Sequence, residues 1–68
     1  MDPFHWLDVQ RIAEELAEAH PHEDPLAIAF PRLKSLVEGL EDFEPQEGHP
    51  ANERILEAIQ QAWIDERD

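Results

Sequence analysis

The chain is short and strongly acidic. Of its 68 residues, 17 are Asp or Glu and five are Lys or Arg, which gives a formal net charge of -12 at pH 7. This length predicts one domain, residues 1–68, and this charge makes nucleic acid and anionic membranes poor partners, while it attracts cations and basic protein surfaces.

The first predicted element is an amphipathic helix from about Asp8 to Ala19. Apolar residues recur there at spacings of three and four, which is the period of a helix face: Val9, Ile12, Leu16 and Ala19. We expect Asp8 to cap the helix N-terminus, and Trp6 or Leu7 to pack back onto the first turn. His20-Pro21 ends the helix, because a residue before proline is disfavoured in the helical region.

A connector, residues 21–30, leads to a second helix. Asp24-Pro25 indicates a short helical turn with Asp24 as its cap, and residues 27–30 suggest a brief extended segment. Pro31 suits the first turn of the second helix, and Gly39 weakens its last turn. Its predicted apolar face consists of Leu33, Leu36, Val37 and Leu40.

The third helix is predicted to begin between Pro50 and Asn52 and to end near Glu66, after a loop rich in proline and glycine. Its apolar face combines Ile55, Ile59, Ala62 and Trp63, with Leu56 at its edge. A tryptophan on such a stripe is usually core, so we expect Trp63 to be buried, and Trp6 to be buried at the entrance of the first helix.

The fold class that these elements predict is mainly α. Three short helices, with at most short β segments beside the loops, resemble a trimmed helix-turn-helix or winged-helix core. That fold usually suggests DNA binding, but the charge of this chain has the wrong sign for it. An apolar content of 41% in clear periods favours a folded chain over a disordered one.

The composition also bears on location and stability. The chain has no cysteine, so it can form neither a disulfide nor a thiolate metal site. No stretch resembles a signal peptide or approaches the ~20 apolar residues of a membrane span. We therefore expect a soluble, cytoplasmic protein that acts as a monomer.

Two groups of side chains could bind a ligand. Glu38, Glu41, Asp42 and Glu44 crowd the end of the second helix, where the helix dipole disfavours carboxylates; a cation or a basic partner would offset this, and a solvated turn is the alternative. His20, His22, Glu23 and Asp24 offer nitrogen and oxygen ligands, but without a defined metal-ligand spacing. The charged exterior of the third helix, which includes Glu57 and Glu66, either widens the acidic group or is simply solvated.

Catalysis has little support in the residues. The chain has no cysteine nucleophile, no Gly-rich phosphate loop with its lysine and no H-E-x-x-H motif. A domain of this size also has little room for the dry pocket that carboxylate catalysis needs. We therefore expect a binding protein and not an enzyme.

Motifs along nearly the whole chain resemble the IscX (YfhJ) family. The resemblance begins with Trp6-x-Asp8 and continues through Pro21, Asp24-Pro25 and Phe30. It is strongest in the LEDF of residues 40–43 and in the NERILEAIQQAWIDE of residues 52–66. Each motif is weak alone, but together, in this order and in a chain of this size and charge, they are specific.

The resemblance implies a modified winged-helix domain that acts as an adaptor or regulator of bacterial iron–sulfur cluster assembly. Family members bind the cysteine desulfurase IscS through acidic residues, compete with frataxin for it, and bind iron weakly. For this chain, it implies a partner-binding acidic patch of Glu38, Glu41, Asp42, Glu44 and Glu57. It further implies no tightly bound cofactor and a weak iron site (Fe2+ or Fe3+) at Glu41, Asp42, Glu44 and Glu47.

The loop before the third helix departs from the family pattern. The family carries a run of aspartates there, whereas residues 44–50 read EPQEGHP, with two carboxylates and a histidine. This difference weakens the case for iron more than the case for IscS. A low-affinity iron donor or sensor, and a generic acidic interaction domain such as a nucleic-acid mimic, remain alternative functions.

Overall fold

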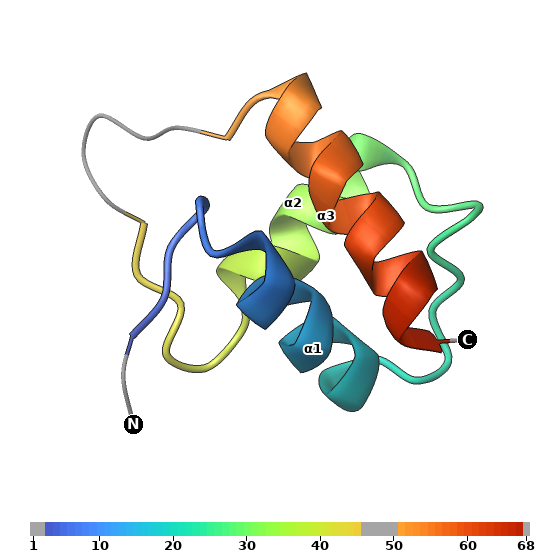
Figure 1. The fold of residues 1–68 in the computed structure, drawn as a ribbon, viewed down its shortest axis with the longest axis horizontal. Coiled ribbons are helices and arrows are strands. Elements are labelled where there is room, and N and C mark those ends of the chain that lie inside the picture. The colour runs from blue at the N-terminus through green and yellow to red at the C-terminus, as the bar shows by residue number, and fades with distance from the viewer. Residues whose placement is uncertain (1–2, 46–50, 68) are drawn as a thin grey trace.

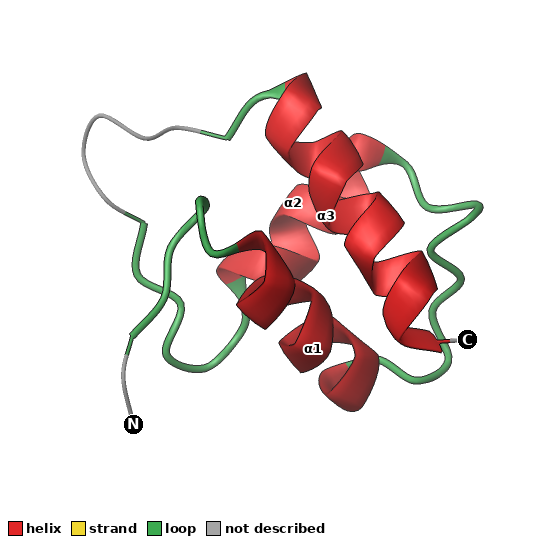
Figure 2. Cartoon of the chain, viewed as in Figure 1, coloured by secondary structure: helices red, strands yellow, loops and turns green. Residues whose placement is uncertain are grey.

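The computed structural model describes residues 3–45 and 51–67, and this part of the chain forms three helices: α1 (Val9–Ala19), α2 (Phe30–Glu38) and α3 (Glu53–Arg67). In Figure 1, α1 and α3 lie in front of α2, and α1 packs more extensively against α3 than α2 packs against either. The described residues contain one isolated parallel β-bridge and no strand, as the colouring in Figure 2 shows. The prediction of a mainly α, three-helix fold is confirmed, and the winged-helix assignment stays a prediction.

The start of α1 differs from the prediction in how Asp8 acts. Asp8 occupies the N-cap position, but its carboxylate makes no hydrogen bond to the first turn of the helix. Its Oδ2 instead accepts a 3.0 Å hydrogen bond from the backbone N–H of His5. Asp8 therefore fixes the turn that leads into the helix. Of the two residues expected to pack onto the first turn, Trp6 is buried and Leu7 is 53% exposed.

The connector confirms the turn predicted at Asp24. Asp24 Oδ1 accepts a 3.0 Å hydrogen bond from the Leu26 N–H, and its carbonyl accepts one from the Ala27 N–H. The predicted extended segment is shorter than expected, because residue 27 belongs to this turn and α2 already begins at Phe30. Ala29, the N-cap residue of α2, has extended backbone angles.

The buried face of α3 is rotated from the predicted one. Leu56, Ile59 and Trp63 are buried, whereas Ile55 is only half-buried, so the expectation that Leu56 lies at the edge was wrong. Asn52 fixes the start of the helix, because its Oδ1 accepts a 2.9 Å hydrogen bond from the Ile55 N–H. Pro50, the other predicted start, lies outside the described residues.

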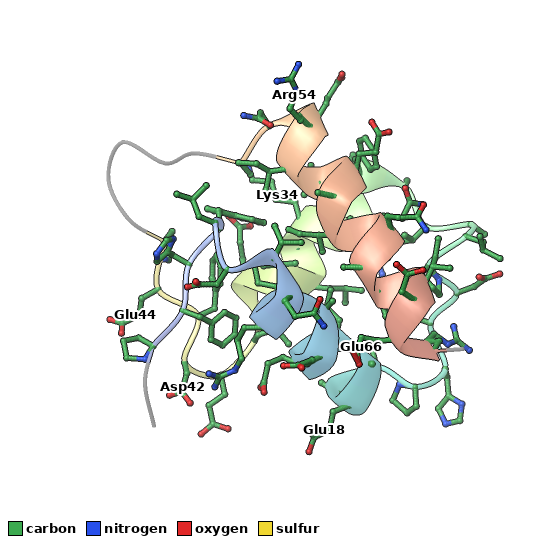
Figure 3. All side chains as sticks on the ribbon, viewed as in Figure 1. Glu18, Lys34, Asp42, Glu44, Arg54 and Glu66 are labelled. Carbon is green, nitrogen blue, oxygen red and sulfur yellow. The ribbon has the colours of Figure 1, made fainter. Side chains whose placement is uncertain are left out.

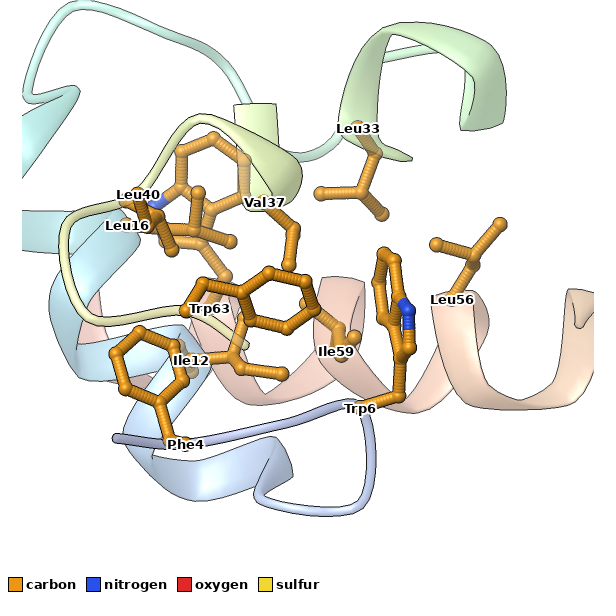
Figure 4. Close-up of a cluster of buried hydrophobic side chains, with 12 residues drawn as sticks. Phe4, Trp6, Ile12, Leu16, Leu33, Val37, Leu40, Leu56, Ile59 and Trp63 are labelled. Carbon is orange, nitrogen blue, oxygen red and sulfur yellow. The ribbon is translucent and has the colours of Figure 1, made fainter. Parts of the chain in front are cut away.

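The three helices and the N-terminal segment enclose one hydrophobic core. Figure 4 shows its side chains converging from all of these elements. Both tryptophans belong to it, which confirms the burial predicted for Trp6 and Trp63. The other buried members are Phe4, Ile12, Ala13, Leu16, Leu33, Val37, Leu40, Phe43, Leu56 and Ile59.

Candidate functional site

The loop that follows α2 carries three of the predicted site residues, and the N-terminal segment holds it in place. We call residues 40–45 the acidic loop. The Phe4 N–H donates a 3.0 Å hydrogen bond to the Asp42 carbonyl, and the Glu44 N–H donates a 2.7 Å hydrogen bond to the Phe4 carbonyl. These two bonds form the parallel bridge between Phe4 and Phe43. In Figure 1 the blue N-terminal segment accordingly runs beside the yellow acidic loop.

Aromatic packing strengthens this pairing. The Phe43 ring makes edge-to-face contacts with Phe4 and Trp6, with centroid distances of 5.7 Å and 4.9 Å. The Arg11 guanidinium lies 4.9 Å from the centroid of the Phe4 ring, in cation–π range. We call Phe4, Trp6 and Phe43 the aromatic clasp. Because Phe43 is buried in the clasp, its neighbours Asp42 and Glu44 lie on the outer side of the loop.

Asp42 has a structural role besides its charge. Its φ angle is 69°, which lies in the left-handed region that residues with a Cβ rarely adopt, although Asp tolerates it better than most. The residue is half-buried, and its carbonyl is the acceptor for the Phe4 N–H. The sequence suggested only a charged side chain at this position, because the hydrogen-bond partner lies far away along the chain.

The structure places the predicted acidic patch in two separate regions. Glu38 ends α2, and Glu41 and Glu44 are exposed in the acidic loop. No described Lys, Arg or His forms an ion pair with any of these three carboxylates. Glu57 instead lies on the outer face of α3, where it lines a shallow hollow with Arg54, Ala58 and Gln61.

Charge is distributed unevenly over the molecule. Arg11 and Arg32 are each paired with a carboxylate, at 3.5 Å from Glu15 and 2.7 Å from Glu23. Lys34 and Arg54 are exposed and make no ion pair with any described residue. In Figure 3 these two cations lie toward the upper end, whereas the labelled carboxylates lie in the lower half: Glu18, Asp42, Glu44 and Glu66.

Arg54 is not isolated from negative charge, because the exposed residues Glu53 and Glu57 lie in the same part of α3. Glu18 comes from α1 and Glu66 from α3, and both lie in the lower half of the view in Figure 3. Each of the two helices has an apolar face, and α1 packs against α3 through these faces. A hydrogen bond of 3.1 Å from Gln10 Nε2 to Glu66 Oε2 joins the same two helices.

Neither predicted metal group forms a preformed site in the described part of the chain. Within residues 3–45 and 51–67, no three His, Asp or Glu side chains lie close enough together to hold a metal ion. Glu41, Asp42 and Glu44 therefore do not make a cage, and Glu47 lies outside the described residues.

Two members of the predicted group of His20, His22, Glu23 and Asp24 are engaged in other contacts. The Glu23 carboxylate pairs with Arg32, and the Asp24 carboxylate accepts the Leu26 N–H. This region borders a surface hollow of about 420 Å³. The residues that line the hollow are His22, Glu23, Asp24, Pro25, Leu26, Ile64 and Arg67.

These features define a small, acidic, α-helical protein with a carboxylate-rich surface. A family model described as iron–sulphur cluster assembly matches residues 4–68. An uncharacterised protein of Pseudomonas aeruginosa is 45% identical over 65 residues, which cover 93% of this chain and 94% of that protein. The chain therefore belongs to the iron–sulphur cluster assembly family of IscX (YfhJ) proteins, which confirms the resemblance. Among the described helices, none is long and apolar enough to cross a bilayer.

Proposed function

We propose that this protein is an adaptor or regulator of bacterial iron–sulfur cluster assembly that docks its acidic face on a basic surface of the cysteine desulfurase IscS. Family membership supports the role in cluster assembly. The observation that carries the docking mode is that Glu38, Glu41 and Glu44 are exposed and have no cationic partner among the described residues. Their role is binding and not catalysis.

Electrostatics explains why such a surface suits a basic partner. Like-charged carboxylates on one surface repel each other, and a cationic partner relieves that repulsion when it binds. The long-range field of a chain with net charge -12 also accelerates encounter with a basic surface. Two acidic proteins that use the same basic region exclude each other, which accounts for the competition with frataxin that the family resemblance implies.

The charge distribution favours one orientation of docking. Approach through the end that carries Asp42 and Glu44 keeps the exposed cations Lys34 and Arg54 away from a basic partner. Approach through the opposite end would bring those cations against the partner together with Glu57, so attraction and repulsion would partly cancel. We therefore place the acidic loop at the centre of the docking surface, and Glu57 outside it.

The same carboxylates bind iron weakly in this proposal. Carboxylate oxygens suit hard cations, so Glu41, Asp42 and Glu44 provide ligands of the right kind. Each would have to be drawn into place on binding, since no described cluster is arranged in advance. Iron thus serves as a loosely held cargo or signal, and no tightly bound cofactor is expected.

Charge reversal tests the docking surface. We compare the affinity for purified IscS of Glu41→Lys/Glu44→Lys with that of Glu53→Lys/Glu57→Lys, which changes net charge equally on the outer face of α3. The loop variant should bind less tightly than the α3 variant, and the wild-type affinity should fall with added salt. Equal losses in the two variants would mean that overall charge and not the acidic loop governs binding. Capture of a DNA-binding protein in place of IscS from a lysate would favour the nucleic-acid mimic.

A further inference from the structure

The N-terminal segment, residues 3–7, makes more contacts than are needed to lead the chain into α1. Phe4 is only 2% exposed although it lies outside every helix, and both of its backbone polar groups bond to the acidic loop. A segment outside regular secondary structure is usually mobile unless other contacts hold it. Here the contacts that hold the segment are contacts with the loop that bears the proposed docking carboxylates.

Few interactions within the acidic loop fix its conformation. One internal backbone bond, from the Phe43 N–H to the Leu40 carbonyl, closes its first turn. Asp42 sits in the left-handed region, a conformation that needs support from its surroundings. That support comes from the Phe4 N–H on the Asp42 carbonyl and from the burial of Phe43 between two aromatic rings.

We propose that Phe4 is a positioning residue for partner binding: the aromatic clasp holds Asp42 and Glu44 in the arrangement that the partner recognises. The inference rests on the proposed function. A partner meets carboxylates that are already ordered, so less conformational freedom is lost on binding. Phe4 carries no charge and is buried, so it contributes to binding only through the loop.

The test uses a mild substitution, since loss of a buried aromatic ring threatens folding. Phe4→Leu keeps an apolar side chain but removes the edge-to-face contact with Phe43 and the contact with Arg11. The matched control is Ile59→Val, which trims the same core on α3, away from the acidic loop. Circular dichroism establishes that both variants are folded.

Two measurements follow on the full chain. Amide hydrogen exchange should be about fivefold faster at Glu44 in Phe4→Leu, relative to the Ile12 amide in α1, because the clasp opens more often. Affinity for purified cysteine desulfurase should fall about threefold, which is the size of an exposed ion-pair effect. Ile59→Val should change neither quantity beyond its general loss of stability.

A double-mutant cycle separates positioning from a general structural role. Because Phe4 acts through Asp42 and Glu44, Phe4→Leu should weaken binding less in a Glu44→Gln background than in the wild type. Persistence of the full loss in that background, or an equal loss in Ile59→Val, would overturn the proposal. So would unchanged affinity of Phe4→Leu alongside faster exchange at Glu44.

Different experimental results would refute the proposed function. If the wild type does not bind the desulfurase, the docking proposal is lost, and with it the claim that the clasp serves docking. If the wild type binds but Glu41→Lys/Glu44→Lys binds equally well, the docking surface lies elsewhere on the protein. In either case the exchange rate at Glu44 still decides whether Phe4 orders the loop.

Discussion

Gln60 on α3 donates a 2.6 Å hydrogen bond from its side-chain Nε2 to the carbonyl of Pro25 in the connector. The connector contains two turns, at residues 20–23 and 24–27, and is joined to α3 by this bond and by one from Arg67 Nη1 to the Glu23 carbonyl. The hollow beside the turn is bordered by Arg67 and by Leu26, whose surface is 75% exposed.

We expect Gln60→Ala to destabilise the fold. The substitution leaves the Pro25 carbonyl without its partner, and a lost hydrogen bond of this kind costs about 1 kcal/mol, or a fall of about 4–8 °C in the melting temperature of a chain this size. Gln61→Ala is the matched control, because Gln61 is exposed on the same helix. Thermal melts by circular dichroism compare the two, and equal shifts would show that the bond to Pro25 contributes nothing.

Trp63→Ala should unfold the protein or nearly so. Trp63 is fully buried, and truncation of a buried aromatic side chain costs about 3–5 kcal/mol, against a total stability of about 5–15 kcal/mol for ordinary domains. Glu41→Ala should melt like the wild type, because Glu41 is exposed. Melts should be run beside IscS binding on both variants. A Trp63→Ala protein that melts normally but no longer binds would mean that the tryptophan belongs to the docking surface.

Substitutions at Asp42 should separate its backbone role from its charge. Asp42→Gly relieves the left-handed conformation, whereas Asp42→Ala should be less stable than Asp42→Gly by about 1 kcal/mol. Asp42→Asn should keep the stability, because Asn tolerates this region, and should lower only the affinity for IscS. Chemical denaturation ranks the three variants. Equal stability of the Ala and Gly variants would show that the backbone angle places no demand on the residue.

Gly39→Ala should stabilise the protein. Gly39 is the C-cap residue of α2 and has ordinary right-handed backbone angles, and a Cβ there would meet the Ser35 carbonyl oxygen at 3.5 Å, an ordinary contact. Alanine lowers the conformational entropy of the unfolded chain, so a gain of about 0.4–1 kcal/mol is expected. A denaturation midpoint at or below that of the wild type would contradict this.

Iron should bind only in the micromolar range or more weakly, which corresponds to about -8 kcal/mol or less favourable. The reason is that no three described carboxylates lie close enough together to hold a metal ion, so binding must bring them together. Isothermal titration calorimetry with Fe2+ under anaerobic conditions measures the affinity. A single nanomolar site would refute the expectation and direct attention back to His20, His22, Glu23 and Asp24.

The helices and much of the core were predictable because their signals are local. The apolar period of α1 gave the burial of Ile12 and Leu16, and the Asp24-Pro25 pair gave the turn in the connector. The buried face of α3 was not predictable at this level of detail, because Ile55, Leu56 and Ile59 are all apolar and packing decides which of them is innermost.

The arrangement of the candidate site was not predictable from local signals. The sequence indicated acidic residues after α2, but the pairing of Phe4 with Asp42 joins residues far apart in the chain, and no periodic pattern marks Phe4. The hydrogen bond of Asp8 to His5 was not predictable for a different reason, because the His5 N–H and the N–H groups of the first helical turn compete for the same carboxylate. The separation of Glu57 from the acidic loop required the packing of the helices.

The extensive packing of α1 against α3 also sets the order in which the fold can be completed during synthesis. A ribosome releases α1 first, but the apolar side chains of Ile12 and Leu16 lie in a core that is closed by Ile59 and Trp63. Until the residues of α3 have left the exit tunnel, that surface stays exposed to water and to other nascent chains. The high negative charge opposes association during this interval, because two incomplete chains repel each other before their apolar faces can meet.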